Sequence, residues 1–216
     1  MKNGLTLFLG VFATLALSWA GVLLTAQRQF GGLAQYKDPA DESLNPAALS
    51  GIADQGRMVY QDLGCVSCHT QQVRREGFGA DIGRGWGTRQ SVARDYLREK
   101  TVLIGQARLG PDLRNAAARP YADAEYFYNL LYAPQSVAPG TNMPSYDFLF
   151  DVRPASDQPS PHALRLTGRF APAPGTQIVP SRRADELVAY LLSLKDTYDY
   201  PEARPFVEPK QKEGGH

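Results

Sequence analysis

At 216 residues the chain is long enough for one hydrophobic core and an anchor, or at most two small domains. Its formal net charge is only +1, so the overall charge gives no case for nucleic-acid binding.

The first element along the chain is an apolar segment, Leu5–Ala26, which carries no charge and predicts a helix that crosses a membrane once. Its 22 residues would measure about 33 Å as a helix, against a bilayer hydrocarbon core of about 30 Å. A cleaved signal peptide is the alternative, because Ser18–Ala20 offers a small-x-small cleavage site. The apolar run continues past that site through Val22–Leu24, so a retained transmembrane anchor over residues 1–28 is the favoured interpretation.

Residues 29–49 are polar and are broken by paired glycines and two prolines, which predicts a linker that lifts the next domain off the membrane. That domain is predicted over residues 50–197. Residues 198–216 are rich in proline and charge, and we expect them to form a flexible tail.

The domain is predicted to begin with a helix between Ser50, a candidate N-cap, and Gly64, which can end a helix. Small or apolar residues recur at helical spacing between these two ends. They are Ile52, Gly56, Val59, Tyr60 and Leu63.

Directly after this helix the chain reads Cys-x-x-Cys-His, the attachment sequence for a c-type haem. Two thiols can add to the two vinyl groups on one haem edge, and the adjacent histidine is then held against the iron. The sequence therefore predicts one covalently bound haem c, with Cys65 and Cys68 as tethers and His69 as an axial iron ligand. No other cysteine remains for a structural disulfide or a four-ligand zinc site. A dithiol redox pair is the alternative, but the strand–helix pattern expected around one is missing.

The haem motif also predicts the side of the membrane. Lys2 precedes the apolar segment and Arg28 follows it, so the flanking charges favour neither orientation. Covalent haem attachment takes place on the outer side of the energy-transducing membrane. We therefore expect a single-pass protein of the bacterial inner (cytoplasmic) membrane with its haem domain in the periplasm.

Basic side chains concentrate after the haem motif. Between residues 71 and 119 there are ten Lys and Arg against five Asp and Glu, a local excess of +5. Such a run usually forms a solvated face, and pairing with haem propionates or docking of a partner is the alternative. The first candidates for these two roles are Arg74, Arg84 and Arg89.

Gly110–Leu113 follows this basic run with the pattern Gly-Pro-x-Leu. In c-type cytochromes such a segment passes the axial histidine, and the proline carbonyl accepts the ring N–H. Pro111 is therefore predicted to hydrogen-bond His69, although Gly-Pro more often marks only a turn.

Three further helices are predicted from apolar spacing and caps. They cover Val92–Arg98, Asp123–Leu131 with Pro134 closing it, and Ser181–Leu194. Small c-type cytochromes cross their first and last helices closely, and Gly56, Tyr60 and Tyr190 are the residues expected at that crossing. No stretch of strand length alternates apolar and polar residues. The predicted fold is all-α: a single N-terminal transmembrane helix followed by a class I cytochrome c-like domain with long loops.

A haem iron held by His69 needs a second protein ligand for electron transfer, or an open position for binding or catalysis. Met1 lies beyond the anchor, and Met58 lies on the helix that leads into the motif. Met143 stands in a loop rich in proline and glycine that can bring its thioether to the far haem face, so it is the favoured second axial ligand. His162, which would give a bis-histidine haem, and an open iron are the alternatives.

The segments around these ligands are more specific than the haem motif. They are Met1–Gly4, Leu63–Arg74, Glu76–Ile82, Arg84–Gly87, Ser91–Tyr96, Gly110–Leu113 and Met143–Tyr146. Together they resemble the monohaem cytochrome c subunit (subunit II) of cbb3-type cytochrome c oxidases. Two features depart from that family: Arg75 stands where many members have proline, and the proline-rich segment Asp147–Pro180 has no match.

The resemblance implies an electron carrier in aerobic respiration. Electrons would come from a dihaem c subunit or a soluble cytochrome c and would go on to the haem-copper catalytic subunit. The chain would not be catalytic on its own, because three histidines cannot supply both the copper ligands and the haem ligand of a haem-copper centre. It also lacks the Cys-x-x-x-Cys pair of a dinuclear copper site.

Three alternatives remain from the sequence. The chain could be the anchored cytochrome of another complex, such as one resembling nitric oxide reductase, or a free-standing membrane cytochrome. It could be a haem sensor or a peroxidase-like enzyme with an open iron. It could also be a structural anchor whose two thiols carry no haem.

Overall fold

The structure is a computed structural model, and it describes residues 3–155, 160–196 and 198–204. The chain divides into two compact units, Met1–Pro46 with Ala93–Glu99, and Ala47–Val92 with Lys100–His216. The domain boundaries expected from the sequence remain predictions.

The first unit begins with helix α1 (Gly4–Phe30), which contains the apolar segment identified in the sequence. Its 27 residues correspond to about 40 Å, and none of them is buried. By length and composition α1 can cross a membrane, and it is the one helix of this kind in the described part of the chain. The hydroxyls of Thr14 and Thr25 bond to carbonyls one turn earlier, so they add no unpaired polar group to this apolar surface. Both a retained anchor and a signal peptide fit this helix.

The same unit holds a two-stranded antiparallel sheet of β1 (Tyr36–Lys37) and β2 (Leu44–Asn45). It also holds a 3₁₀ turn, Ala93–Tyr96, where a helix over Val92–Arg98 was predicted. The expected helix is reduced to this single turn, and the Ser91 hydroxyl just before it accepts a hydrogen bond from the Val73 backbone N–H at 2.9 Å.

The second unit begins with α2 (Gly51–Asp62), and its predicted ends are confirmed. The Ser50 side chain accepts a hydrogen bond from the backbone N–H of Ala53, which caps the first turn. Gly64 ends the helical region with a left-handed backbone (φ 71°), a conformation that glycine adopts without a steric penalty. A 3₁₀ turn over Cys65–Ser67 follows at once, so the haem motif begins where α2 ends.

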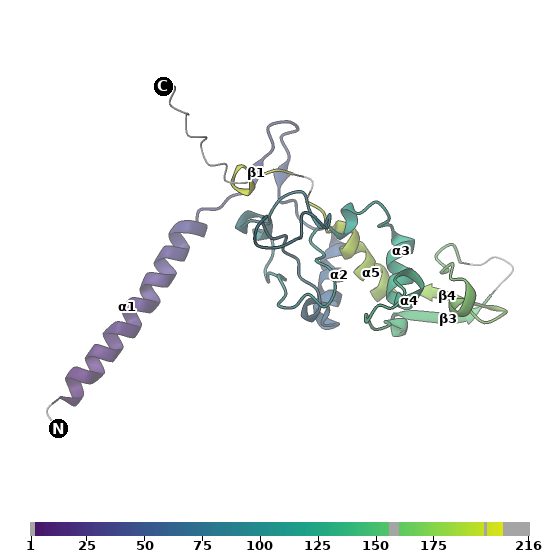
Figure 1. The fold of residues 1–216 in the computed structure, drawn as a ribbon, viewed down its shortest axis with the longest axis horizontal. Coiled ribbons are helices and arrows are strands. Elements are labelled where there is room, and N and C mark those ends of the chain that lie inside the picture. Colours follow the sequence, from purple (N-terminus) through teal and green to yellow (C-terminus); the bar gives the residue numbers. More distant parts are fainter. Residues whose placement is uncertain (1–2, 156–159, 197, 205–216) are drawn as a thin grey trace, which may run out of the picture. The chain divides into compact units, whose positions relative to one another are not determined.

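Helix α5 (Arg182–Ser193) starts at its predicted cap, Ser181, and crosses α2 (Figure 1). A Cβ atom placed on Gly56 would lie 1.8 Å from the backbone oxygen of Glu186, so only glycine permits this approach. Beside it the rings of Tyr60 and Tyr190 meet edge to face, 5.4 Å between centroids. The helix crossing expected from the sequence is confirmed.

Two shorter helices cover the other side of α5. Helix α3 (Ala124–Tyr132) is capped by Asp123, and Pro134 both ends it and starts the single turn α4 (Pro134–Val137). The hydroxyl of Tyr128 donates to Asp185 at 2.7 Å, which ties α3 to α5. The largest core side chains of these helices are Tyr60, Phe127, Leu131, Leu187, Val188, Tyr190 and Leu191.

The expectation of an all-α fold is only partly right. Besides the β1–β2 pair, β3 (Phe150–Pro154) and β4 (Thr176–Pro180) form an antiparallel pair, with Val152 opposite Ile178. Ile178 is buried whereas Val152 is 62% exposed. Strand β4 therefore supplies core residues, and β3 mainly covers β4. β3 alternates apolar and polar residues over only four positions, Phe150–Arg153, and β4 does not alternate, so the sequence signal for this pair is weak.

The segment predicted as a flexible tail lies only partly within the described residues. A 3₁₀ turn forms over Pro201–Ala203, and Tyr200 and Ala203 are buried. Residues 205–216 lie outside the described part of the chain.

Replacing Gly56 with alanine should destabilise the protein by about 3 kcal/mol or more, because the new Cβ meets backbone and overpacked cores typically lose about 1–3 kcal/mol. Thermal unfolding of the full chain in detergent, followed by circular dichroism, measures this. Gly51→Ala is the matched control, since no atom lies within 4 Å of its new Cβ at the start of the same helix. Equal melting temperatures for the two variants would contradict the close approach.

Candidate haem-binding site

The haem motif forms a tight turn at the end of α2. Its two cysteines are free, half-buried thiols, and the backbone N–H groups of Cys68 and His69 both donate to the carbonyl of Cys65. Burial raises the pKa of the Cys65 thiol to about 11, against the lowering effect of a hydrogen bond with the Tyr146 hydroxyl. The turn therefore holds both thiols and the imidazole within one short, hydrogen-bonded segment.

The imidazole of His69 is held from one side by the Gly110–Pro111 segment. Its Nδ1 lies 2.8 Å from the carbonyl oxygen of Pro111, and a carbonyl can only accept a hydrogen bond. Nδ1 must therefore carry the proton, which leaves the lone pair on Nε2. Burial lowers the pKa of His69, although the bond to Pro111 acts in the opposite direction. The result is a neutral ring whose Nε2 is free of any described partner.

Gly110 sets how closely this segment approaches the ring. A Cβ atom on Gly110 would lie 2.2 Å from His69 Cε1, so the backbone itself packs against the imidazole. Two backbone bonds hold the approach: Gly110 N–H to the Cys68 carbonyl at 3.0 Å, and Leu113 N–H to the Thr70 carbonyl at 2.7 Å. The two segments thus run side by side past His69.

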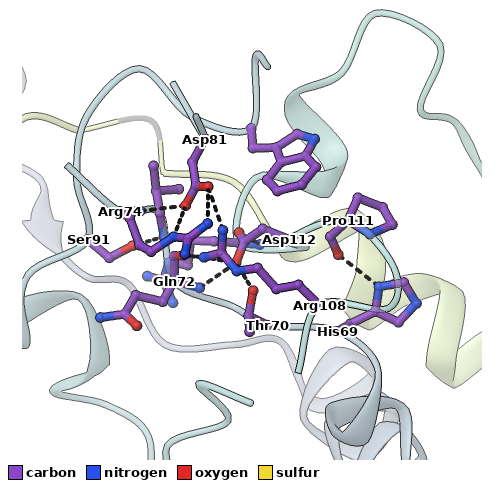
Figure 2. A network of polar contacts seen from close by, with 12 residues as sticks. His69, Thr70, Gln72, Arg74, Asp81, Ser91, Arg108, Pro111 and Asp112 are labelled. Carbon is purple, nitrogen blue, oxygen red and sulfur yellow. Dashed lines mark hydrogen bonds and ion pairs between the residues drawn. The ribbon is translucent and has the colours of Figure 1, made fainter. Parts of the chain in front are cut away.

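A buried carboxylate, Asp112, lies between these segments (Figure 2). One of its oxygens accepts from the Thr70 hydroxyl at 2.6 Å and from the Gln72 backbone at 2.7 Å. The other accepts from the Arg114 backbone at 2.9 Å. The Arg108 guanidinium approaches the same carboxylate at 3.6 Å.

A second buried carboxylate, Asp81, joins the loop after the motif to Arg108 (Figure 2). It forms ion pairs with Arg108 and with Arg74, whose Nη2 lies 3.1 Å from Oδ1. Burial by itself would raise the pKa of Asp81, but the hydrogen bonds from Arg108 and Arg74 lower it from 3.8 to about 2. Arg108 also donates to the Gln72 carbonyl at 2.6 Å, so one guanidinium connects both carboxylates with the chain after His69.

The three arginines predicted to pair with propionates or to dock a partner do not all lie together. Arg74 is paired with Asp81, and Arg84 lies over the Trp86 ring with 5.0 Å from Cζ to the centroid. Arg89 lies elsewhere, with its Nη2 3.9 Å from Asp196 and its Nε donating to the Tyr198 carbonyl at 3.1 Å. Part of the Arg74 and Arg89 guanidinium groups is thus engaged by protein groups, and a role of the three arginines towards propionates or a partner stays a prediction.

The two candidates for the second axial ligand differ in burial. Met143 is half-buried and packs against the core, whereas His162 is exposed. Three residues after Met143, the Tyr146 hydroxyl forms its hydrogen bond with Cys65, which brings this loop to the haem motif. Burial raises the pKa of Tyr146 to about 12, so its hydroxyl stays protonated near neutral pH.

These residues fit a c-type haem. The turn presents two free thiols, the tautomer of His69 leaves Nε2 for iron, and Gly110 leaves the room that the imidazole occupies. Within the described ranges, no three His, Cys, Asp or Glu side chains are grouped so as to hold a different metal ion. Axial ligation by Met143 stays a prediction.

Sequence reasoning missed Asp81, Arg108, Asp112 and Tyr146. Asp112 could have been found, since it lies inside the Gly-Pro-x-Leu pattern, at the position that the pattern leaves open. The pairing of Asp81 with Arg108 carries no spacing signal, because the two residues lie 27 positions apart in a stretch of mostly irregular chain.

Comparison with known proteins agrees with this geometry. A family model described as "Cytochrome C oxidase, mono-heme subunit/FixO" matches residues 5–168, a stretch that contains the haem motif, Pro111 and Met143. Among curated proteins, none matches the chain.

Asp81 should make the stability of the protein depend on pH. Because its folded pKa is depressed, its ion pairs stabilise the fold above about pH 4, and this stabilisation is lost as the pH falls towards 2. Denaturant unfolding of the full chain should show Asp81→Asn about 2 kcal/mol less stable at pH 6, with the gap narrowing between pH 4 and 2. Asp151→Asn, which breaks an exposed pair with Arg153, is the control and should change little. A gap that does not change with pH would rule out this role of Asp81.

Proposed function

Since the chain belongs to the family of mono-haem subunits of cytochrome c oxidase, and resembles the cbb3-type subunit in particular, we propose that it relays electrons to the catalytic subunit of a terminal oxidase. The observation that carries this proposal is the match over residues 5–168, which includes the haem motif and Met143. The donor would be a dihaem c subunit or a soluble cytochrome c, and the acceptor the haem-copper subunit.

The cofactor would be one haem c, tethered by Cys65 and Cys68 and ligated by His69 and Met143. A bound haem would supply one-electron chemistry at its iron. The protein's part is to hold the ligands in place: Gly110 and Pro111 fix the imidazole ring, and the core contacts of Met143 limit the motion of its loop. Ligands that move little make the change of oxidation state easier.

The fold supports a class I cytochrome c-like domain. A haem motif at the end of the first domain helix, a close crossing with the last helix and a proline carbonyl on the axial histidine all occur in the second unit. The β3–β4 pair and the segment after residue 193 would be additions to that core.

Helix α1 would be a retained anchor in the bacterial inner membrane, with the haem domain in the periplasm. The length and the exposed apolar surface of α1 support the anchor, and the periplasmic side follows from the proposed covalent haem. The anchor would place the domain beside the membrane subunit that receives its electrons.

Purification from native membranes in mild detergent tests the relay. We expect a large haem-copper subunit to copurify with this chain, and haem to stay on the chain after denaturing electrophoresis. A Cys65→Ala/Cys68→Ala variant should lose the haem stain. Recovery without a haem-copper subunit would oppose the proposal, and carbon monoxide binding to the reduced isolated protein would favour an open-iron sensor or enzyme.

Met143→His should lower the reduction potential, because methionine favours reduced iron more than a second histidine does. Potentiometric titration of the full chain in detergent, with optical spectra, measures the change. Met58→His is the control: Met58 is 51% exposed on α2, and its replacement should leave potential and spectrum unchanged. An unchanged potential and spectrum in Met143→His would remove Met143 from the coordination shell.

A further inference from the structure

We propose that Asp112 is a positioning residue for the axial histidine: its carboxylate ties the chain after His69 to the segment that carries Pro111 and thereby sets the strength of the His69–Pro111 hydrogen bond. This inference rests on the proposed function, since it concerns how the chain adjusts a haem iron.

The Asp112 carboxylate is surrounded by hydrogen-bond donors. Asp112 is fully buried, and the polar groups that approach it within hydrogen-bond distance are all donors: the Thr70 hydroxyl and the backbone N–H groups of Gln72 and Arg114. An amide in its place would turn an NH₂ group towards at least one of them. The site is therefore built for two acceptor oxygens.

These hydrogen bonds join two separate segments of the chain. Thr70 and Gln72 belong to the segment that leaves His69, whereas Asp112 directly follows Pro111. A side-chain link next to each of the two hydrogen-bonded residues restricts how far the Pro111 carbonyl can move from the ring. The Arg119 guanidinium donates to the Asp112 carbonyl at 2.6 Å, which fixes the same residue from its backbone side.

A guanidinium group stabilises the Asp112 carboxylate. Arg108 lies 3.6 Å from Asp112 and donates to the Gln72 carbonyl at 2.6 Å, so it compensates the buried charge and binds the same pair of segments. Arg108 is in turn held by Asp81. The link between the segments is thus a connected polar cluster, in which both Asp112 and Arg108 contact the chain after His69.

The strength of the His69–Pro111 hydrogen bond would affect the reduction potential of a bound haem iron. A strong acceptor on Nδ1–H makes the imidazole a better electron donor, which favours the oxidised metal. If the link is weakened, the bond to Pro111 lengthens, the imidazole donates less and the reduction potential rises. Loss of the negative charge acts in the same direction, so a variant that keeps the charge is needed to separate the two effects.

Thr70 supplies that variant. Thr70→Val removes one hydrogen bond to Asp112 and leaves every charge in place, and Thr70→Ser is the matched control that keeps the hydroxyl. Thr70 is 6% exposed, and valine has nearly its shape. If Thr70→Val does not fold, Thr70→Ala replaces it in the comparison with Thr70→Ser.

The full chain, purified in detergent with its haem, is titrated potentiometrically, and oxidised samples are compared by electron paramagnetic resonance, which reports the arrangement of the axial ligands. We expect Thr70→Val and Asp112→Asn to raise the reduced-to-oxidised ratio at the wild-type midpoint at least threefold, which is about 28 mV at 59 mV per tenfold. Their largest g value should shift as well, and Thr70→Ser should match the wild type in both measurements.

A shift in Asp112→Asn with none in Thr70→Val would mean that Asp112 acts only through its charge, and the positioning role would be wrong. No shift in either variant would also overturn it. If Asp112→Asn cannot be purified, the positioning role is tested by Thr70→Val against Thr70→Ser alone. The same threefold change in the reduced-to-oxidised ratio is then required. A wild-type chain without haem would overturn the proposed function together with this inference, whereas haem with unshifted potentials would overturn the inference alone.

Discussion

The close approach of α2 and α5 is the constraint on which the rest of the domain depends. Because Gly56 has no side chain, the two backbones meet directly, and Tyr60 and Tyr190 fill the angle between them. The haem motif starts where α2 ends, so its position follows from this crossing. The Tyr190 hydroxyl extends the constraint further, since it donates to Gln71 at 2.9 Å, two residues past the axial histidine.

The helices are held together by hydrophobic packing, whereas the loops around the motif are held together mainly by buried ion pairs. Arg108 with Asp81, and Arg114 with Asp196, are largely removed from water, and each carboxylate has more than one donor. Burying charge is costly unless it is paired and hydrogen-bonded on all sides. In long loops without regular structure, such pairs specify one arrangement where apolar contacts would permit several. In the basic run after the motif, Arg108 and Arg114 therefore belong to the interior, whereas half of the basic side chains are exposed: Arg74, Arg75, Arg84, Arg98 and Lys100.

The sequence predicts the helices well because each signal is local. Ser50, Asp123 and Ser181 cap their helices where expected, and the apolar stripe of α5 faces α2. The haem motif and the Gly-Pro pattern are likewise short and continuous, so the contact of Pro111 with His69 could be anticipated. The β3–β4 pair could not, because β3 alternates over only four residues, β4 does not alternate, and the two strands pair across a long loop. Nor could the cluster around Asp112, whose members come from separate loops and meet only in three dimensions.

The bond between Tyr190 and Gln71 also bears on the order of events during biogenesis, because it joins residues 119 positions apart. Contacts at such separation form late, since a long loop must close first. Under the proposed function, α2 would have no partner until α5 is complete, and the two thiols would lie on an open segment. A haem could then be joined to them before the final helix packs. The late contact would keep the domain open until the cofactor is in place.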